Sequence, residues 1–143
     1  MDVERIVNGS YGELWENGEH QQNVNAVTAE VTIDKADVRL SGDRWLHKKV
    51  IGLSGTGTIT GFKVTSAMIQ RHAWAQGARG VPTKTELITK LDDPEAYGAE
   101  RIRLKNVSFD KIILANFKPN ELVTEEIPFT FTGYELLDPI EEA

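Results

Sequence analysis

The sequence predicts a mainly β fold, an antiparallel β-sandwich or small barrel with one flanking helix at about 65–77. Two observations lead to this class. Several short segments alternate apolar and polar residues with a period of two, which is typical of half-buried strands. Only residues 65–77 combine an N-capping residue, a helical stretch and a closing glycine. With 143 residues, 40% of them apolar and 27% charged, the chain suits a single globular domain, 1–143.

The first elements predicted are two strands at about 10–16 and 19–24. Asn17 and Gly18 lie between them, and this pair favours a type I′ turn, which needs positive φ at both central positions. The next strand is predicted over 27–33, where four apolar residues at alternate positions share one face.

Residues 36–54 interrupt this pattern. They are polar and basic, and they are predicted to form either a long projecting loop or a long hairpin that leaves the body. A large aromatic residue on such a segment is often an interface anchor, which singles out Trp45. The basic residues that accompany it are Arg39, Arg44, Lys48 and Lys49.

A threonine-rich strand with several glycines is predicted over 55–64. Thr65 and Ser66 then offer an N-cap for a helix of about three turns, which Gly77 ends. The following strand is predicted over 86–91.

The C-terminal part predicts two further strands. Alternation in the segment after 100 changes phase at Asn106, as a β-bulge would cause, and Ile112–Ala115 is predicted to continue that edge. Residues 126–132 alternate again, and Pro128, which lacks an amide hydrogen, indicates an edge strand or a bulge.

Charge is distributed unevenly along the chain. The net charge is −6, yet residues 119–143 contain seven acids and no lysine or arginine, whereas residues 1–118 carry a net charge of +1. Tight binding of nucleic acid usually needs clustered bases, so this function class is disfavoured. No apolar run is long enough to cross a membrane, and the absence of cysteine excludes a thiolate metal site or thiol nucleophile.

No motif predicts catalysis or a cofactor. The segment 52–56 resembles a nucleophile elbow around Ser54, but a threonine stands where the final glycine is required. The histidines lack metal-ligand spacing. Asp92 and Asp93 precede a proline, which is ordinary turn chemistry. The sequence therefore predicts a protein that is not an enzyme and holds no cofactor or metal.

Three stretches carry a family resemblance: GTGTITGFKVTS (55–66), LDDPEAYGAERIRLKNVSFDKI (91–112) and EEIPFTFTGYELL (125–137). In order and spacing they resemble the tail tube proteins of PBSX-type defective prophages and related contractile tails of myophages and R-type bacteriocins. The opening hairpin, GSYGELWENGE (9–19), fits this family too. The resemblance covers nearly the whole chain except about 72–82.

The resemblance implies a structural subunit that self-assembles into hexameric rings, which stack into a hollow tube. Implied partners are further copies of the chain, the tail sheath protein, the baseplate or tail-initiator protein and the tape-measure protein. DNA is implied only as passing cargo, and no membrane is involved. The implied location is the tail of a virion or phage-like particle assembled in the bacterial cytoplasm. In this family a long loop bridges the rings, and the matching segment is Ala36 to Ser54.

A subunit interface follows as a hypothesis. The basic residues Arg39, Arg44, Lys48 and Lys49, with Trp45, are predicted to meet an acidic C-terminal surface that includes Glu125 and Glu126. The alternative interpretation is that the basic and the acidic residues form two separate solvated faces. Two other function classes remain as alternatives: a soluble ligand-binding β-barrel module, which needs a closed apolar pocket, and a small hydrolase that uses Ser54 or the Asp92–Asp93 pair.

Overall fold

The first hairpin forms at the predicted turn. In the computed structural model, which describes residues 2–71, 76–77, 79–80 and 84–142, Asn17 and Gly18 have φ values of 50° and 86°. Both are positive, as a type I′ turn requires, so this prediction is confirmed. The two strands that the turn joins pair antiparallel, with Trp15 opposite His20.

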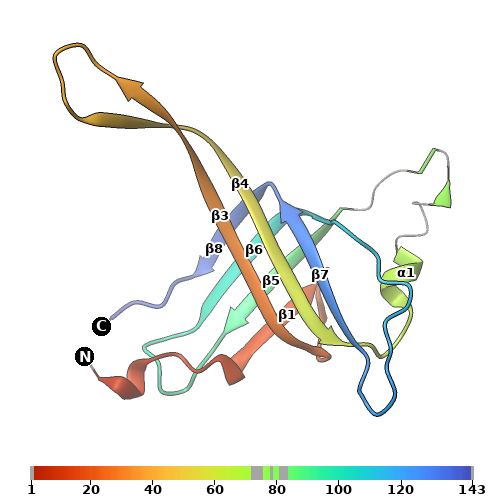
Figure 1. Ribbon diagram of the computed structural model, residues 1–143. Coiled ribbons are helices and arrows are strands. Elements are labelled where there is room, and N and C mark those ends of the chain that lie inside the picture. The colour runs from red at the N-terminus through yellow and green to blue at the C-terminus, as the bar shows by residue number, and fades with distance from the viewer. Residues whose placement is uncertain (1, 72–75, 78, 81–83, 143) are drawn as a thin grey trace.

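Eight strands account for most of the described residues, and all of their pairings are antiparallel. Two short 3₁₀ helices precede them, and one α-helix lies between the fourth and fifth strands (Figure 1). The elements are η1 (Val3–Arg5), η2 (Gly9–Tyr11), β1 (Gly12–Glu16), β2 (Glu19–His20), β3 (Val24–Arg39), β4 (Leu46–Phe62), α1 (Ala67–Arg71), β5 (Thr85–Leu91), β6 (Glu100–Phe109), β7 (Thr124–Phe131) and β8 (Gly133–Asp138).

The strands form two layers that share β6. The strand order is β2-β1-β5-β6-β7-β4-β3, and β8 pairs with the other side of β6. We call β3, β4 and β7 the front sheet, and β2, β1, β5, β6 and β8 the back sheet, as they lie in Figure 1. The mainly β, antiparallel fold predicted from the sequence is confirmed.

A bulge lets β6 pass from one layer to the other. Thr85 pairs with Val107 and Leu87 pairs with Leu104, so two residues of β6 oppose one of β5. Asn106 lies in this bulge with φ 53°, which confirms the predicted change of phase. Beyond it, Ser108 and Phe109 pair with β7 of the front sheet.

The strand predicted to continue β6 is absent. Residues 111–118 have no regular secondary structure and lead into the loop before β7. The apolar run Ile112–Ala115 has no alternation that would bury one face and expose the other, so nothing fixes it in a sheet.

Pro128 marks neither the outer strand nor the bulge that were predicted, because β7 lies between β4 and β6 and pairs with β4 without a register shift. The Pro128 carbonyl accepts a hydrogen bond of 2.9 Å from the Asp110 amide. In an antiparallel strand, the nitrogen of a residue points to the same side as its carbonyl, so the Pro128 nitrogen faces away from β4. The missing amide hydrogen therefore costs no bond to β4.

The helix begins where its cap predicts. The Thr65 hydroxyl accepts a hydrogen bond of 3.3 Å from the Ala67 amide, and the described helix runs over Ala67–Arg71. The rest of the predicted helix includes residues 72–75, which lie outside the described residues.

Residues 36–54 are strand, not irregular loop, apart from a short connection. β3 and β4 remain paired out to Arg39 and Leu46, with an extra residue, Ile51, bulged between the Asp34–Gly52 and Lys35–Val50 pairs. Figure 1 shows this hairpin projecting well beyond both sheets. Of the two forms considered from the sequence, the hairpin is the one present.

The core lies between the two sheets. Its fully or nearly fully buried side chains come from both layers: Leu14, Ile59, Leu87, Leu104, Val107, Phe129 and Phe131. The Phe129 ring contacts Phe109 edge-on, with centroids 6.3 Å apart, and Phe131 at 6.2 Å. The hairpin thus extends from two sheets that are packed against each other.

Candidate functional site: surfaces for assembly

The five hairpin residues singled out by sequence lie together, far from the two acids predicted as their partners. Leu46 begins β4, whereas Glu126 pairs with Thr60 near its other end. Fourteen residues of strand separate these positions, which is about 45 Å at 3.3 Å per residue. Within one copy the basic and acidic groups therefore do not meet.

Among the described residues, three of the seven C-terminal acids are paired with bases of their own copy. Glu125 lies 3.8 Å from the Lys63 ammonium with only 16% of its side chain exposed. Glu135 lies 3.6 Å from both Arg103 and Lys105 on the back sheet. Local pairing of this kind depends on strand register, which the uneven distribution of charge along the sequence does not reveal.

The connection at the end of the hairpin is ordered by Asp43. Its amide donates to the Leu40 carbonyl at 3.3 Å, and Gly42 has φ 80°, as the third residue of a type II turn requires. The Asp43 carboxylate accepts from the Trp45 amide at 2.9 Å and lies 2.6 Å from Nε2 of His47. Trp45 is 78% exposed, so this turn holds a large apolar side chain in water.

Hydrogen bonds from His47 and from the Trp45 amide lower the pKa of the Asp43 carboxyl. The ordered turn therefore favours the ionised carboxylate. The turn is fully ordered above the pH range in which an ordinary aspartate titrates, and it loses this order as the pH falls through the lowered pKa. We expect Asp43→Ala to make the Trp45 amide mobile at neutral pH, as acid does in the parent chain. NMR relaxation of that amide measures both effects. An unchanged, rigid Trp45 amide in the variant would contradict this role.

The outer face of the front sheet carries hydroxyl groups and acids. Register places Thr28 opposite Thr58, Thr32 opposite Ser54, and Thr56 opposite Thr130. Alternation turns these side chains away from the core residues that lie between them. The stretches 24–34, 52–62 and 124–131, which build this sheet, contain no lysine or arginine. The face is thus polar, with negative charge only.

The back sheet differs, because its outer face carries paired charges of both signs. Arg103 lies 2.8 Å from Glu86 on β5, and Arg101 lies 2.5 Å from Asp138 on β8. Lys48 on the hairpin is likewise paired, 2.7 Å from Asp37 on the facing strand.

The residues considered for catalysis take structural positions. Both Asp93 oxygens accept backbone hydrogen bonds, 2.8 Å from the Asn8 amide and 2.9 Å from the Glu95 amide, and the residue is 6% exposed. Ser54 lies within β4, opposite Thr32. Among the described residues, no group of three His, Asp or Glu side chains could hold a metal ion. In the same part of the chain, no helix is long and apolar enough to span a membrane.

The space between the sheets is an open groove of about 640 Å³ and not a closed pocket. Its lining is largely apolar and includes Leu14, Val27, Leu91 and Ile102. The alternative of a ligand-binding barrel required an enclosed apolar cavity, so it is not favoured. Sequence reasoning missed this groove, since strand alternation marks core-facing residues without showing which of them remain uncovered.

Comparison with known proteins places the chain in a family. A family model described as "Phage tail tube protein" matches residues 1–138. The "Phage-like element PBSX protein XkdM" of Bacillus subtilis (strain 168) is 29% identical over 143 residues, which covers 99% of this chain and 97% of that protein.

Two solved structures show the same fold. One is the sheath/tube terminator of an extracellular contractile injection system in its extended state, with a TM-score of 0.77, 12% identity, and coverage of 96% of this chain and 100% of that one. The other is the sheath–tube complex of an extracellular contractile injection system, with a TM-score of 0.72, 13% identity, and coverage of 94% and 93%.

Proposed function

Because the chain belongs to the phage tail tube protein family, we propose that it is the structural subunit of a contractile tail and that the outer face of its front sheet lines the bore. Six copies form a ring, and stacked rings form the hollow tube. The observation that carries the orientation is the hydroxyl-rich face of β3, β4 and β7, whose stretches carry no lysine or arginine. Such a face suits a water-filled conduit, since it does not capture the phosphates of passing DNA.

Ring closure uses the two ends of the front sheet. β3 ends the strand order, so along its length one edge pairs with no strand among the described residues. At the other end, among the described strands, the Thr124–Ile127 part of β7 pairs with β4 alone, and the Asn116 side chain donates a hydrogen bond of 3.0 Å to the Thr124 carbonyl. Exposed strand edges readily pair with other chains. When two different edges meet, the contact is heterologous and closes into a ring if the rotation permits.

The surfaces that do not line the bore make the other contacts of the subunit. The ion-paired outer face of the back sheet turns outward, toward the sheath protein. The hairpin reaches along the tube axis to the next ring. Baseplate or initiator and tape-measure proteins act at the tube end and in the bore, and the tail assembles in the bacterial cytoplasm. As a tail-particle component, the chain has a structural and not a catalytic role.

Electron microscopy tests both the assembly and the orientation. Concentrated protein should form six-fold rings or tubes. In the cysteine-free chain, Thr58→Cys labelled with maleimide-linked gold should place gold along the tube axis, whereas Lys90→Cys on the back sheet should place it outside. A chain that stays monomeric at millimolar concentration with sheath and baseplate proteins present would overturn the tube function. Tubes with Thr58 gold on their outer wall would overturn the orientation alone.

A further inference from the structure

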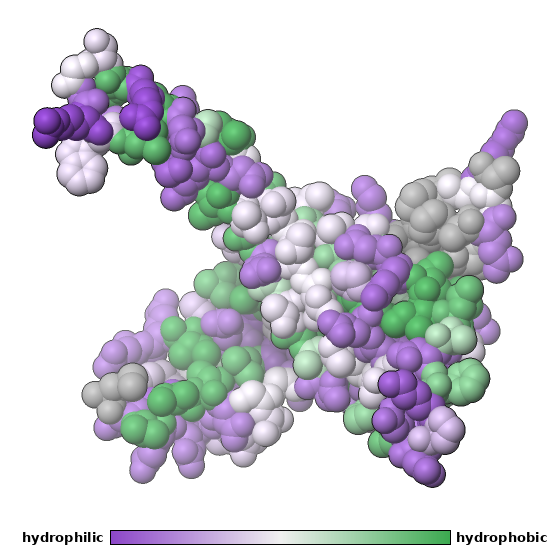
Figure 2. All heavy atoms as spheres, viewed as in Figure 1, coloured by the Kyte–Doolittle hydropathy of each residue, from purple (hydrophilic) through white to green (hydrophobic). Residues whose placement is uncertain are grey.

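The core faces of the two sheets continue beyond the core without cover. On the front sheet, Val31, Ile33 and Leu53 lie on the core-facing side but are 37%, 53% and 66% exposed. On the back sheet, Tyr134 and Leu136 pair with core-facing residues of β6 and are 60% and 51% exposed. Figure 2 shows a deep notch between the hairpin and the lower part of the molecule.

Of these residues, Val31 and Tyr134 line the open groove between the two sheets. Its volume of about 640 Å³ falls within the range of sites that enclose whole ligands. An apolar surface this open in an isolated copy indicates a partner.

The hairpin tip, residues 39–46, has matching chemistry. Trp45 is 78% exposed, and Leu40 and Leu46 are 53% and 39% exposed. A buried tryptophan removes 150–250 Å² of surface from water and is among the commonest interface anchors. The tip projects beyond both sheets (Figure 1) and does not line the groove of its own copy, so it is available to another copy.

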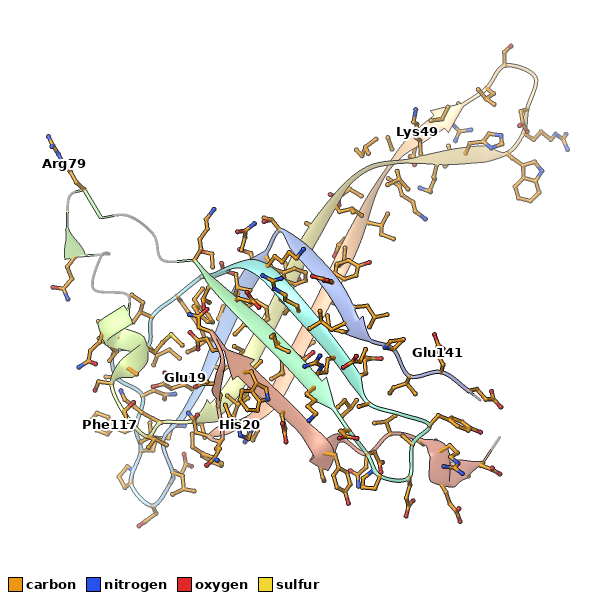
Figure 3. All side chains as sticks on the ribbon, turned by 180° about the vertical axis from the view of Figure 1, so that it is seen from behind. Glu19, His20, Lys49, Arg79, Phe117 and Glu141 are labelled. Atoms are coloured by element: carbon orange, nitrogen blue, oxygen red, sulfur yellow. The ribbon has the colours of Figure 1, made fainter. Side chains whose placement is uncertain are left out.

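Charge agrees with this pairing. Glu100 starts β6 and lines the groove. Glu141 and Glu142 follow β8, and the last residue of β8, Asp138, pairs with Arg101, the neighbour of Glu100 in the chain. Figure 3 shows Glu141 on the C-terminal segment and Lys49 on the hairpin, well apart within one copy. Across the described residues, no ion pair of 4.0 Å or less joins these three acids to a base.

The two arginines at the tip carry the opposite charge. Arg39 and Arg44 are exposed, and within the described part of the chain neither has a carboxylate partner. By contrast, Glu125 is occupied by Lys63. Glu100, which lines the groove, is therefore better placed than Glu125 to receive the basic hairpin of a second copy.

We propose that the groove of one copy receives the hairpin tip of a second copy. Trp45 packs between the two apolar walls, and the tip arginines face Glu100, Glu141 and Glu142. This inference rests on the proposed function, because it names the acceptor of the hairpin that bridges rings. Donor and acceptor are different surfaces, so each copy offers one of each and the contact repeats along the stack.

Site-specific cross-linking tests the acceptor. One protein carries Ser41→Cys in the tip, and a second carries Thr89→Cys, whose position lines the groove. The two are mixed, assembled and treated with a short bis-maleimide. Thr58→Cys, which replaces a threonine on the outer face of the front sheet, is the matched control. We expect a linked dimer with the groove cysteine and none with the control.

Charge reversal adds an independent measurement. Arg39→Glu with Arg44→Glu should raise the concentration needed for assembly about tenfold, the size expected for two exposed ion pairs. Adding Glu141→Arg and Glu142→Arg to the same chain should restore it. Normal tubes without the groove cross-link, or with a link to the control, would overturn this inference and leave the tube function standing. No assembly of the parent chain would overturn both.

Discussion

Replacing Gly57 with alanine should destabilise the fold by about 3 kcal/mol or more, the upper range for overpacking a core. A Cβ atom at Gly57 would overlap both the Phe129 ring and the carbonyl oxygen of Thr28. Phe129 is fully buried, and Thr28 belongs to the neighbouring strand. Neither the ring nor the backbone can move without disturbing the core, so the strain outweighs the free energy gained by burying the added methyl group. Denaturant unfolding measures the loss.

Gly52→Ala is the matched control in the same strand. A Cβ atom there would meet only the Asp34 side chain, at an ordinary 3.6 Å. We expect a change within about 0.5 kcal/mol, as for most surface substitutions. Equal effects of the two alanines would show that the close packing of Phe129 on β4 is not what requires the glycine.

Local signals account for what the sequence predicted well. Asn17 and Gly18 define a turn through their own backbone preferences, and the bulge at Asn106 is visible as a change of alternation. Strands with one buried face carry a period of two because burial selects the side chains on that face. The order and type of the main elements could therefore be inferred without tertiary information.

The form of the hairpin could not be decided in the same way. Most residues from 35 to 51 are exposed, so burial imposes no alternation on them, and the extra residue Ile51 shifts the phase between the two halves of β4. The pairing that makes these residues a strand comes from continuation of the β3–β4 ladder. β8 was also missed, since its place depends on β6 across the sheet.

The candidate site was predictable in part. Trp45 and the hairpin bases stand out by residue type, and the structure places them together at one exposed end. The partner predicted for them, Glu125 with Glu126, stays a prediction. Glu125 looks available in the acidic C-terminal stretch, yet folding brings it to Lys63. Acceptor surfaces made by two sheets exist only after the strands have paired.

Shortening the hairpin should abolish tubes while leaving the fold intact. Residues 35–51 are replaced with Asn-Gly, which joins the paired residues Asp34 and Gly52 through a two-residue turn. The removed residues lie outside the core, so we expect the melting temperature to stay within about 5 °C, a change of roughly 1 kcal/mol.

The shortened chain provides its own control, because it lacks the hairpin tip but keeps the groove and the front sheet. A chain that can receive a contact but not give one ends a heterologous stack, so small amounts added to the parent protein should shorten the tubes. Electron microscopy measures tube length against the fraction of shortened chain. Tubes of normal length from the shortened chain alone would show that the hairpin does not bridge rings. A large fall in melting temperature would instead show that residues 35–51 support the core, in conflict with their exposure.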